Sequence, residues 1–209
     1  PIQFLQKIGM LSKLKFKILS IPKFQNSIFT NLESKKLKGS QEYDRELLIK
    51  IGQIRARNKR ILKHLLELNE QGKQVLYFGP SVEQSKLMAL LLSTFNVKVG
   101  VVDKDTPREY RTELIKKFHE KKINFLLNYE VFTSGFDSPK VDTVFIARPT
   151  KSSNTLLQMM GRGMRGPKAQ GTSSCDIVYV QDSVLEEFQN FEKLYKSYDE
   201  YYEQEKLTE

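Results

Sequence analysis

Residues 74–81 read Gln-Val-Leu-Tyr-Phe-Gly-Pro-Ser, and this stretch decides the fold class. Its continuous apolar run is typical of a strand that is covered on both faces, as the strands of parallel sheets are. Ser81 then begins a helix, because Ser81 and Gln84 stand at the spacing of a capping box, which satisfies backbone N–H groups at a helix start. A buried strand followed at once by a helix predicts one unit of an α/β fold.

The same unit recurs along the chain. We expect further strands at residues 97–102, 123–127, 143–147 and 175–180. Helical patterns separate them, and one of these begins with Thr106 as the N-cap and Pro107 at the first helical position. Strands that alternate with helices predict a parallel sheet with helices on both faces. Ligands of such sheets bind beyond the carboxyl ends of the strands.

The first 40 residues differ from the rest in charge. They hold eight lysines, no arginine and one acid, so they carry +7 of the net charge of +9. This charge favours a polyanionic partner, and an exposed lysine-rich arm is the alternative. Residues 14–18 alternate apolar side chains with lysines, which predicts an edge strand or a connector. We therefore expect a basic linker or extension (1–40), an α/β domain (41–182) and a C-terminal helix (183–209).

Leucines and isoleucines recur at helical spacing between residues 47 and 66. We expect two helices here, with a break at Asn58. The basic residues of this stretch are expected on a solvated face, with a nucleic-acid track as the alternative. They are Arg55, Arg57, Lys59, Arg60 and Lys63.

Composition argues against several classes of protein. No apolar run approaches the length that spans a bilayer, and no signal peptide is recognisable, so we expect no membrane partner. The single cysteine, Cys175, lies in an apolar run and is expected to be buried in a reducing compartment, which predicts a cytoplasmic protein. One cysteine and two separated histidines, His64 and His119, do not make a metal site.

The candidate chemistry centres on residues 158–167, which read Gln-Met-Met-Gly-Arg-Gly-Met-Arg-Gly-Pro. On a helix, Gln158, Arg162 and Arg165 would share one face, and two guanidinium groups suit the oxygens of a phosphate. Gly161 and Gly163 would leave room for a close approach. The alternative is a basic surface helix with two solvated arginines. A dinucleotide-binding fingerprint is disfavoured, because no strand ends just before these glycines.

Two loops that follow strands could hold the rest of a ligand. At Ser81 a helix N-terminus can attract a phosphate, although a well-capped helix explains the pattern equally well. In the loop at residues 128–139, Gly135 would allow the backbone to approach a ligand, and Asp137 could accept a hydrogen bond from a sugar hydroxyl. The alternative there is an Asx turn before Pro139.

The order of these three segments resembles motifs IV, V and VI of superfamily 2 helicases. The matching segments are residues 78–81, 133–137 and 158–165. The resemblance covers roughly residues 73–182 and points to the second RecA-like lobe of a DEAD/DEAH-type helicase. It is closest to the branch of type III restriction subunits and related DNA translocases, since a DEAD-box RNA helicase would have histidine at the position of Gln158.

The resemblance implies a role for each matching residue. Arg162 and Arg165 would be arginine fingers that reach the γ-phosphate of ATP, and Gln158 would help to sense the nucleotide. An added arginine of this kind is worth on the order of a thousandfold or more in rate. The other residues at the nucleotide would be Gly135, Asp137 and Gly161. The residues that touch the nucleic-acid backbone would be Ser81, Thr133 and Ser134.

The sequence lacks the phosphate loop G-x-x-x-x-G-K-[ST] and the paired acids that would hold Mg²⁺. We therefore expect ATP and Mg²⁺ to be held mainly by a missing first lobe, to which residues 1–40 connect, and we expect this chain alone to be inactive. The predicted function is the second motor lobe of an ATP-dependent helicase or translocase that acts on nucleic acid, DNA rather than RNA. The alternative is a stand-alone nucleic-acid-binding or partner-docking module without ATPase activity.

Overall fold

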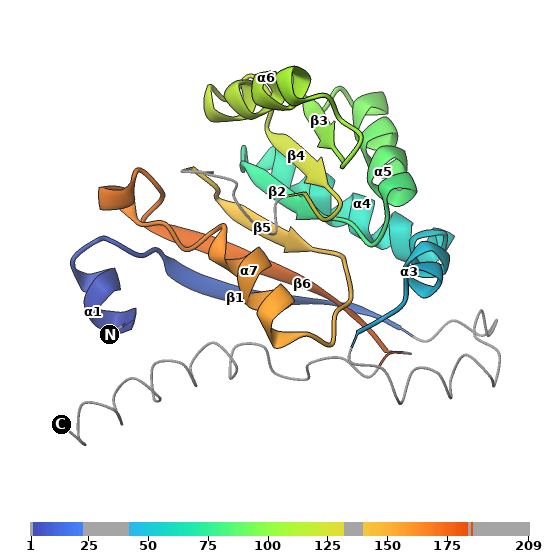
Figure 1. Ribbon diagram of the computed structural model, residues 1–209, viewed down its shortest axis with the longest axis horizontal. Coiled ribbons are helices and arrows are strands. Elements are labelled where there is room, and N and C mark those ends of the chain that lie inside the picture. Colours follow the sequence, from blue (N-terminus) through green and yellow to red (C-terminus); the bar gives the residue numbers. More distant parts are fainter. Residues whose placement is uncertain (1, 23–41, 132–139, 184, 186–209) are drawn as a thin grey trace.

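The computed structural model describes residues 2–22, 42–131, 140–183 and 185. In this part of the chain six parallel strands form a sheet in the order β1-β6-β5-β2-β4-β3 (Figure 1). The strands are β1 (Lys13–Ile21), β2 (Val75–Phe78), β3 (Val99–Val102), β4 (Phe125–Asn128), β5 (Thr143–Ile146) and β6 (Ser174–Asp182). Because the strands are parallel, their carboxyl ends meet at one edge. The predicted α/β class is confirmed.

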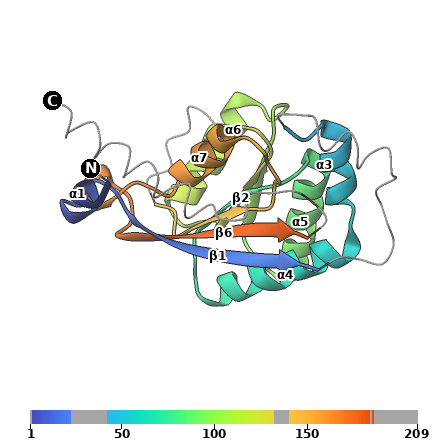
Figure 2. The ribbon, with the colours of Figure 1, turned by 90° about the horizontal axis from the view of Figure 1, so that it is seen from below.

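Helices cover both faces of this sheet, as the view in Figure 2 shows. One apolar cluster joins α4 and α5 to the sheet, and a second joins α6 and α7 to the opposite face. Burial on both faces explains why β2 is apolar at every position. The helices are α1 (Ile2–Lys7), α3 (Arg45–Gly52), α4 (Arg55–Glu70), α5 (Val82–Thr94), α6 (Arg108–His119) and α7 (Ser153–Gly161), with a 3-10 turn η1 (Pro167–Ala169).

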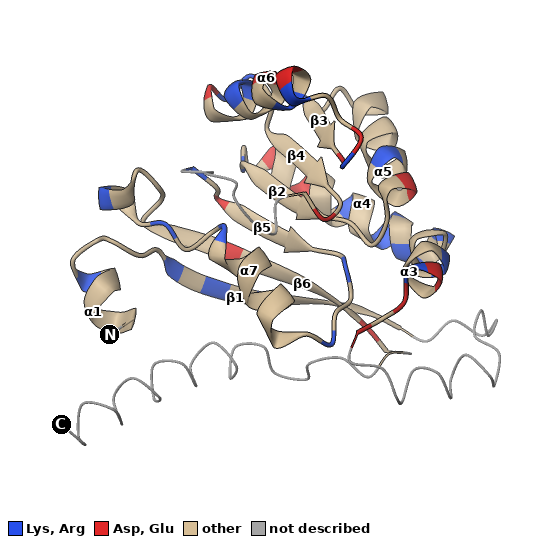
Figure 3. Ribbon diagram, in the orientation of Figure 1, with Lys and Arg blue, Asp and Glu red and all other residues tan. Residues whose placement is uncertain are grey.

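Strand β1 is the edge strand of the sheet and pairs with β6 along its whole length. Its apolar side chains Leu14 and Phe16 pack on the cluster below α6 and α7, and Ile21 is buried on the other face. Its three exposed lysines appear as blue bands in Figure 3. The expected apolar face is confirmed at Leu14 and Phe16, whereas Ile18 is 51% exposed. Of the two alternatives the edge strand is correct. The division of the chain at residue 40 stays a prediction, although β1 is hydrogen-bonded into the sheet.

The break between α3 and α4 lies earlier than expected. It falls between Gly52 and Arg55, whereas Asn58 lies inside α4. The side-chain amide of Asn58 donates to the carbonyl oxygen of Gly52 over 2.7 Å, so Asn58 satisfies the carboxyl end of α3. The polar residue that suggested a helix break thus stabilises the junction from within the next helix.

Of the three expected helix caps, those of α5 and α7 form and that of α6 does not. Ser81 accepts a hydrogen bond from the backbone N–H of Gln84, and Ser152 caps α7 in the same way. Thr106 does not cap α6, because the N-cap position is Pro107. The hydroxyl of Thr106 donates to the carboxylate of Asp103 over 2.8 Å instead, which fixes the turn after β3.

Arg57 contradicts the prediction of a solvated basic face. Its side chain is 0% exposed and forms a salt bridge of 2.8 Å with Asp182. It also donates to the carbonyl oxygen of Ala147 over 2.7 Å. Arg57 therefore ties α4 to the carboxyl ends of β5 and β6. The neighbouring Arg55 and Lys59 are exposed, as expected.

Candidate functional site

Helix α7 ends before both arginines of the central stretch. Its last residue is Gly161, Arg162 is the C-cap, and Arg165 forms an isolated antiparallel bridge with Leu11. The expectation that Gln158, Arg162 and Arg165 share one helical face is therefore wrong at Arg165. The chain leaves the helix because Gly163 packs on the sheet and Arg165 pairs with Leu11. The spacing of residues along a helix does not predict either contact.

Gly163 shows this packing directly. A Cβ at Gly163 would lie 2.5 Å from Cys175 Sγ and 3.0 Å from a methyl group of Val144, so the backbone runs against β5 and β6. At Gly161 a Cβ would meet nothing within 4 Å. Of the two glycines expected to leave room for a ligand, only Gly161 adjoins open space.

Arg162 and Arg165 follow α7 to the amino ends of the strands. Val144 and Cys175, which pack on Gly163, are the second residues of β5 and β6. Arg165 is held nearby, since its carbonyl oxygen accepts a hydrogen bond of 3.0 Å from the backbone N–H of Thr172, just before β6. Helix α7 thus carries the chain from the carboxyl end of β5 back to the opposite edge.

The environment of the two arginines is partly buried and positive. Burial lowers the pKa of Arg162, which means that the guanidinium has lost part of its hydration, although arginine stays charged. The pKa of His119 is lowered, first by burial and then by the positive charge of Arg165. A cavity of about 470 Å³ opens beside His119 and is lined also by Lys140, Pro167, Gln170 and Gly171. Gln158, in contrast, is exposed on α7.

Ser81 lies at the other edge of the sheet, directly after the carboxyl end of β2. Its side chain is buried, and its hydroxyl accepts the hydrogen bond that caps α5. Glu83 in the first turn has a lowered pKa, because its own backbone N–H and then the Ser81 hydroxyl bond to its carboxylate. The helix N-terminus thus already holds a negative charge, and a phosphate would compete with Glu83 there.

The structure brings Arg162 and Arg165 to one edge and leaves Ser81 at the other. Thr133, Ser134, Gly135 and Asp137 lie outside the described residues. The nearest described residues on the two sides are Val131 after β4 and Lys140 before β5.

The carboxyl edge also carries basic and aromatic residues that we did not single out from the sequence. Arg148, after β5, lies 2.9 Å from the carboxylate of Glu130 and over the ring of Tyr129 at 5.3 Å. Lys151 lies over the ring of Tyr43 at 5.1 Å. Such pairs contribute about 0.5–1 kcal/mol each at exposed sites. Their position in the chain was the available signal, since Tyr129 and Glu130 follow the end of β4, and Arg148 and Lys151 follow the end of β5.

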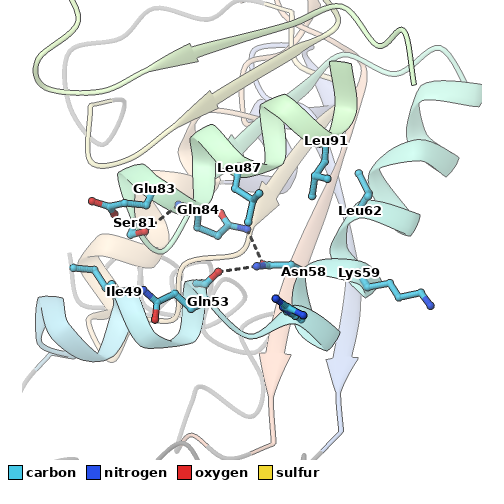
Figure 4. A pocket seen from close by; sticks show the side chains of 12 residues that line it. Ile49, Gln53, Asn58, Lys59, Leu62, Ser81, Glu83, Gln84, Leu87 and Leu91 are labelled. Atoms are coloured by element: carbon cyan, nitrogen blue, oxygen red, sulfur yellow. Dashed lines mark hydrogen bonds between the residues drawn. The ribbon is translucent and has the colours of Figure 1, made fainter. Parts of the chain in front are cut away.

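A second cavity, of about 510 Å³, lies between α3, α4 and α5 (Figure 4). Its floor is a chain of hydrogen bonds in which Tyr77 donates to Gln84, and Gln84 donates to Asn58. Its wall is apolar and includes Ile49, Leu62, Leu87 and Leu91. Leu87, on α5, is 41% exposed here.

Within the described ranges, no three His, Cys, Asp or Glu side chains form a group that could hold a metal ion. No helix of those ranges is long and apolar enough to cross a membrane. Cys175 is buried, as expected, and burial raises the pKa of its thiol to about 12.

Residues 57–167, more than half of the chain, match the family described as the helicase conserved C-terminal domain. The chain belongs to this family. The family and the parallel sheet agree with the second lobe that the sequence predicted, and the predicted RecA-like fold is confirmed.

The names of two relatives of this helicase domain differ in whether they specify a nucleic acid: one is called an ATP-dependent helicase, and the other an ATP-dependent RNA helicase. IRC3 of Saccharomyces cerevisiae, assigned as an ATP-dependent helicase, is 34% identical over 110 residues, which are 52% of this chain and 16% of that protein. DEAD-box ATP-dependent RNA helicase 31 of Oryza sativa is 29% identical over 99 residues, which are 47% of this chain and 18% of that protein. The match thus spans less than a fifth of either relative.

Among solved structures, a fragment assigned as the HsdR subunit of a type I restriction enzyme from Vibrio vulnificus is similar to this helicase domain. The TM-score is 0.59 at 20% identity, and the match covers 88% of this chain and 34% of that chain. A likeness at this identity shows the shared fold.

Proposed function

We propose that this chain is the second motor lobe of an ATP-dependent helicase or translocase, and that Arg162 and Arg165 are arginine fingers for ATP held by a first lobe. The observation that carries the proposal is the fixed backbone of Arg165. A catalytic guanidinium stabilises a transition state only if it is held in place before the reaction. Arg162 is also partly stripped of water, which strengthens its interaction with an anion.

ATP and Mg²⁺ are assigned mainly to the other lobe. The two guanidinium groups fit the oxygens of a terminal phosphate, which they can bind through several N–H donors. Gln158, Gly161, Gly135 and Asp137 are proposed to complete the nucleotide side. Without the first lobe, we expect the chain to bind ATP poorly and not to hydrolyse it.

We propose that nucleic acid runs along the carboxyl edge of the sheet. Ser81 is the proposed backbone contact at this edge, where Arg148 and Lys151 add positive charge. Thr133 and Ser134, which lie outside the described residues, are proposed as further contacts from the motif resemblance alone. Contacts to phosphates hold a nucleic acid without reading its sequence. The resemblance to DNA translocases favours DNA over RNA, and the cytoplasmic location remains a prediction.

The test is ATP turnover in the protein that carries both lobes, with saturating single-stranded or duplex DNA, and with RNA in parallel. Arg165→Ala is expected to lower kcat about a thousandfold, with a much smaller change in KM for ATP. Arg165→Lys should rescue little, because lysine cannot replace the planar fork. Lys168→Ala, which removes an exposed cation three residues away, is the matched control and should leave kcat within about twofold.

Unchanged turnover in Arg165→Ala would contradict the arginine-finger role and would favour the alternative of a binding module without ATPase activity. The apolar cavity between α3, α4 and α5 is the observation that supports this alternative. Stronger stimulation by RNA than by DNA would contradict only the choice of nucleic acid.

A further inference from the structure

Residues 9–12, which we name the N-terminal clasp, are bonded to the loop that contains Arg165. The backbone N–H of Ser12 donates to Met164 O over 2.8 Å, and the N–H of Gly166 donates to Met10 O over 2.9 Å. These two bonds come directly before and after Arg165. The N–H of Lys168 donates to Gly9 O over 2.9 Å and continues the pairing.

Ser12 is the centre of the clasp. Its side chain is 0% exposed, and its hydroxyl oxygen lies 2.5 Å from the carbonyl oxygens of both Arg165 and Thr172. Because a hydroxyl has one proton, it donates to one of these oxygens at a time. Thr172 N–H donates to Arg165 O as well, so the peptide group of Arg165 is bonded from two sides.

Two glycines let these segments come so close together. A Cβ at Gly166 would lie 2.4 Å from the carbonyl oxygen of Gly9, and a Cβ at Gly171 would lie 2.0 Å from that of Arg165. Contacts below 3.0 Å with backbone atoms force a movement of the backbone. The position of Arg165 is therefore determined by the clasp on one side and by Gly171 and Thr172 on the other.

We infer that Ser12 is a positioning residue for Arg165: the N-terminal clasp fixes the backbone from which this guanidinium reaches its phosphate. The inference rests on the proposed function, since it assigns a catalytic effect to a residue that touches no substrate. Ser12 is distant from Arg165 in sequence, by 153 positions, and it lies outside the matched helicase segment at residues 57–167. Misplacing a catalytic group by about 1 Å can lower a rate about 100-fold.

The experiment is a double-mutant cycle in the protein that carries both lobes, with Ser12→Ala, Arg165→Ala and both together. Ser12→Ala alone is expected to lower kcat about 10- to 100-fold, with KM for ATP changed by less than about threefold. In the Arg165→Ala background the same substitution should change kcat by less than about twofold, because the group that Ser12 positions is gone. Ser20→Ala, an exposed serine of β1, is the matched control and should leave kcat unchanged.

Hydrogen exchange of the same proteins supplies a readout that does not depend on turnover. Ser12→Ala is expected to lower the protection of the Gly166 and Thr172 amides about 10-fold and to leave the amides of β2 unchanged. If Ser12→Ala does not fold, Gly171→Ala tests the same point, because its methyl group displaces Arg165 from the opposite side. It should show the same loss of kcat and the same lack of effect in the Arg165→Ala background.

A kcat unchanged by Ser12→Ala, while Arg165→Ala lowers it, would overturn the inference and leave the proposed function standing. An equal loss in both backgrounds would also overturn it, because the effect would then be one of general stability. If Arg165→Ala itself has no effect, the proposed function fails and the catalytic role of the clasp fails with it. Hydrogen exchange then still reports whether Ser12 holds the loop.

Discussion

Arg165 at the amino edge of the sheet and Arg148 at the carboxyl edge are held by different means. At the amino edge, the backbone around Arg165 is bonded to segments that are far away in sequence. At the carboxyl edge, Arg148 is held by side chains alone, Glu130 at 2.9 Å and the ring of Tyr129. Arg148 is only 11% exposed, but its partner Glu130 is 52% exposed, so the Glu130 side of this pair stays open to salt and to other anions. Backbone hydrogen bonds depend little on salt. The amino edge thus suits a fixed catalytic group, and at the carboxyl edge a polyanion can compete with the exposed Glu130 for Arg148.

The largest effect on stability is expected for Arg57, which anchors the carboxyl edge. Arg57→Ala leaves the buried carboxylate of Asp182 without its charged partner and should destabilise the chain by about 3–5 kcal/mol. Urea unfolding of the 209-residue chain measures this loss. Arg55→Ala, two residues earlier and exposed, is the control and should cost less than about 0.5 kcal/mol. Equal losses would mean that the ion pair does not anchor this edge.

At the amino edge, Gly163→Ala should destabilise the chain by about 1–3 kcal/mol, because its methyl group would overlap Cys175 and Val144. Gly161→Ala adds the same methyl group where nothing lies within 4 Å, and alanine favours a helix by up to about 1 kcal/mol. Thermal unfolding compares the two. Two similar shifts in Tm would contradict the close packing of Gly163 on the sheet.

The N-cap of α5 at the carboxyl edge is expected to contribute less to the free energy of unfolding than the close packing of Gly163. Ser81→Ala removes the side-chain acceptor for Gln84 N–H and should cost about 1 kcal/mol. The exposed Ser173, in the loop before β6, provides a control substitution that removes no cap. Urea unfolding of both variants gives the difference, and a loss at Ser173 as large as that at Ser81 would argue against the cap.

The smallest expected effect is a change in the pKa of His119 on substitution of Arg165. Arg165→Ala should raise the pKa of His119 because it removes a nearby positive charge, while the larger effect of burial stays. A lowered folded pKa costs stability only as the pH falls below the unfolded value of about 6.5, where the unfolded chain takes up a proton first. The substitution should therefore make stability less sensitive to acid.

NMR titration of the imidazole signals measures the pKa of His119 directly. Lys59→Ala, on the opposite face of the sheet, serves as the control and should not move it. A His119 pKa that stays the same in Arg165→Ala would show that the guanidinium does not lie where the structure has it.

Local sequence patterns predicted the sheet and its helices. A strand that is buried on both faces is apolar at nearly every position, so each short segment can be recognised by itself. Arg57 was misassigned although a signal existed. It stands four residues before Ile61 and eight before Leu65, which are both buried, so it belongs to the apolar stripe of α4. Arg55 and Lys59 do not share that spacing, and both are exposed.

The site was harder to predict than the sheet. The arginines, Gln158 and Ser81 could be selected by residue type and motif order, but the path of the chain after Gly161 could not. It depends on pairing with Leu11 and Ser12, and no spacing within residues 158–167 contains that information. Long-range backbone pairing is the part of this structure that a local pattern does not encode.

Strand β1 has a consequence for the order in which the molecule assembles during synthesis. Its Lys17 binds Asp176 of β6, 159 positions later, so β1 leaves the ribosome well before the strand with which it pairs. Domains assemble as the chain emerges at about 5–20 residues per second, so this interval lasts on the order of ten seconds. The exposed lysines of β1 oppose edge-to-edge association meanwhile. Arg165 can reach its final position only when the segment that leads into β1 has been placed beside it.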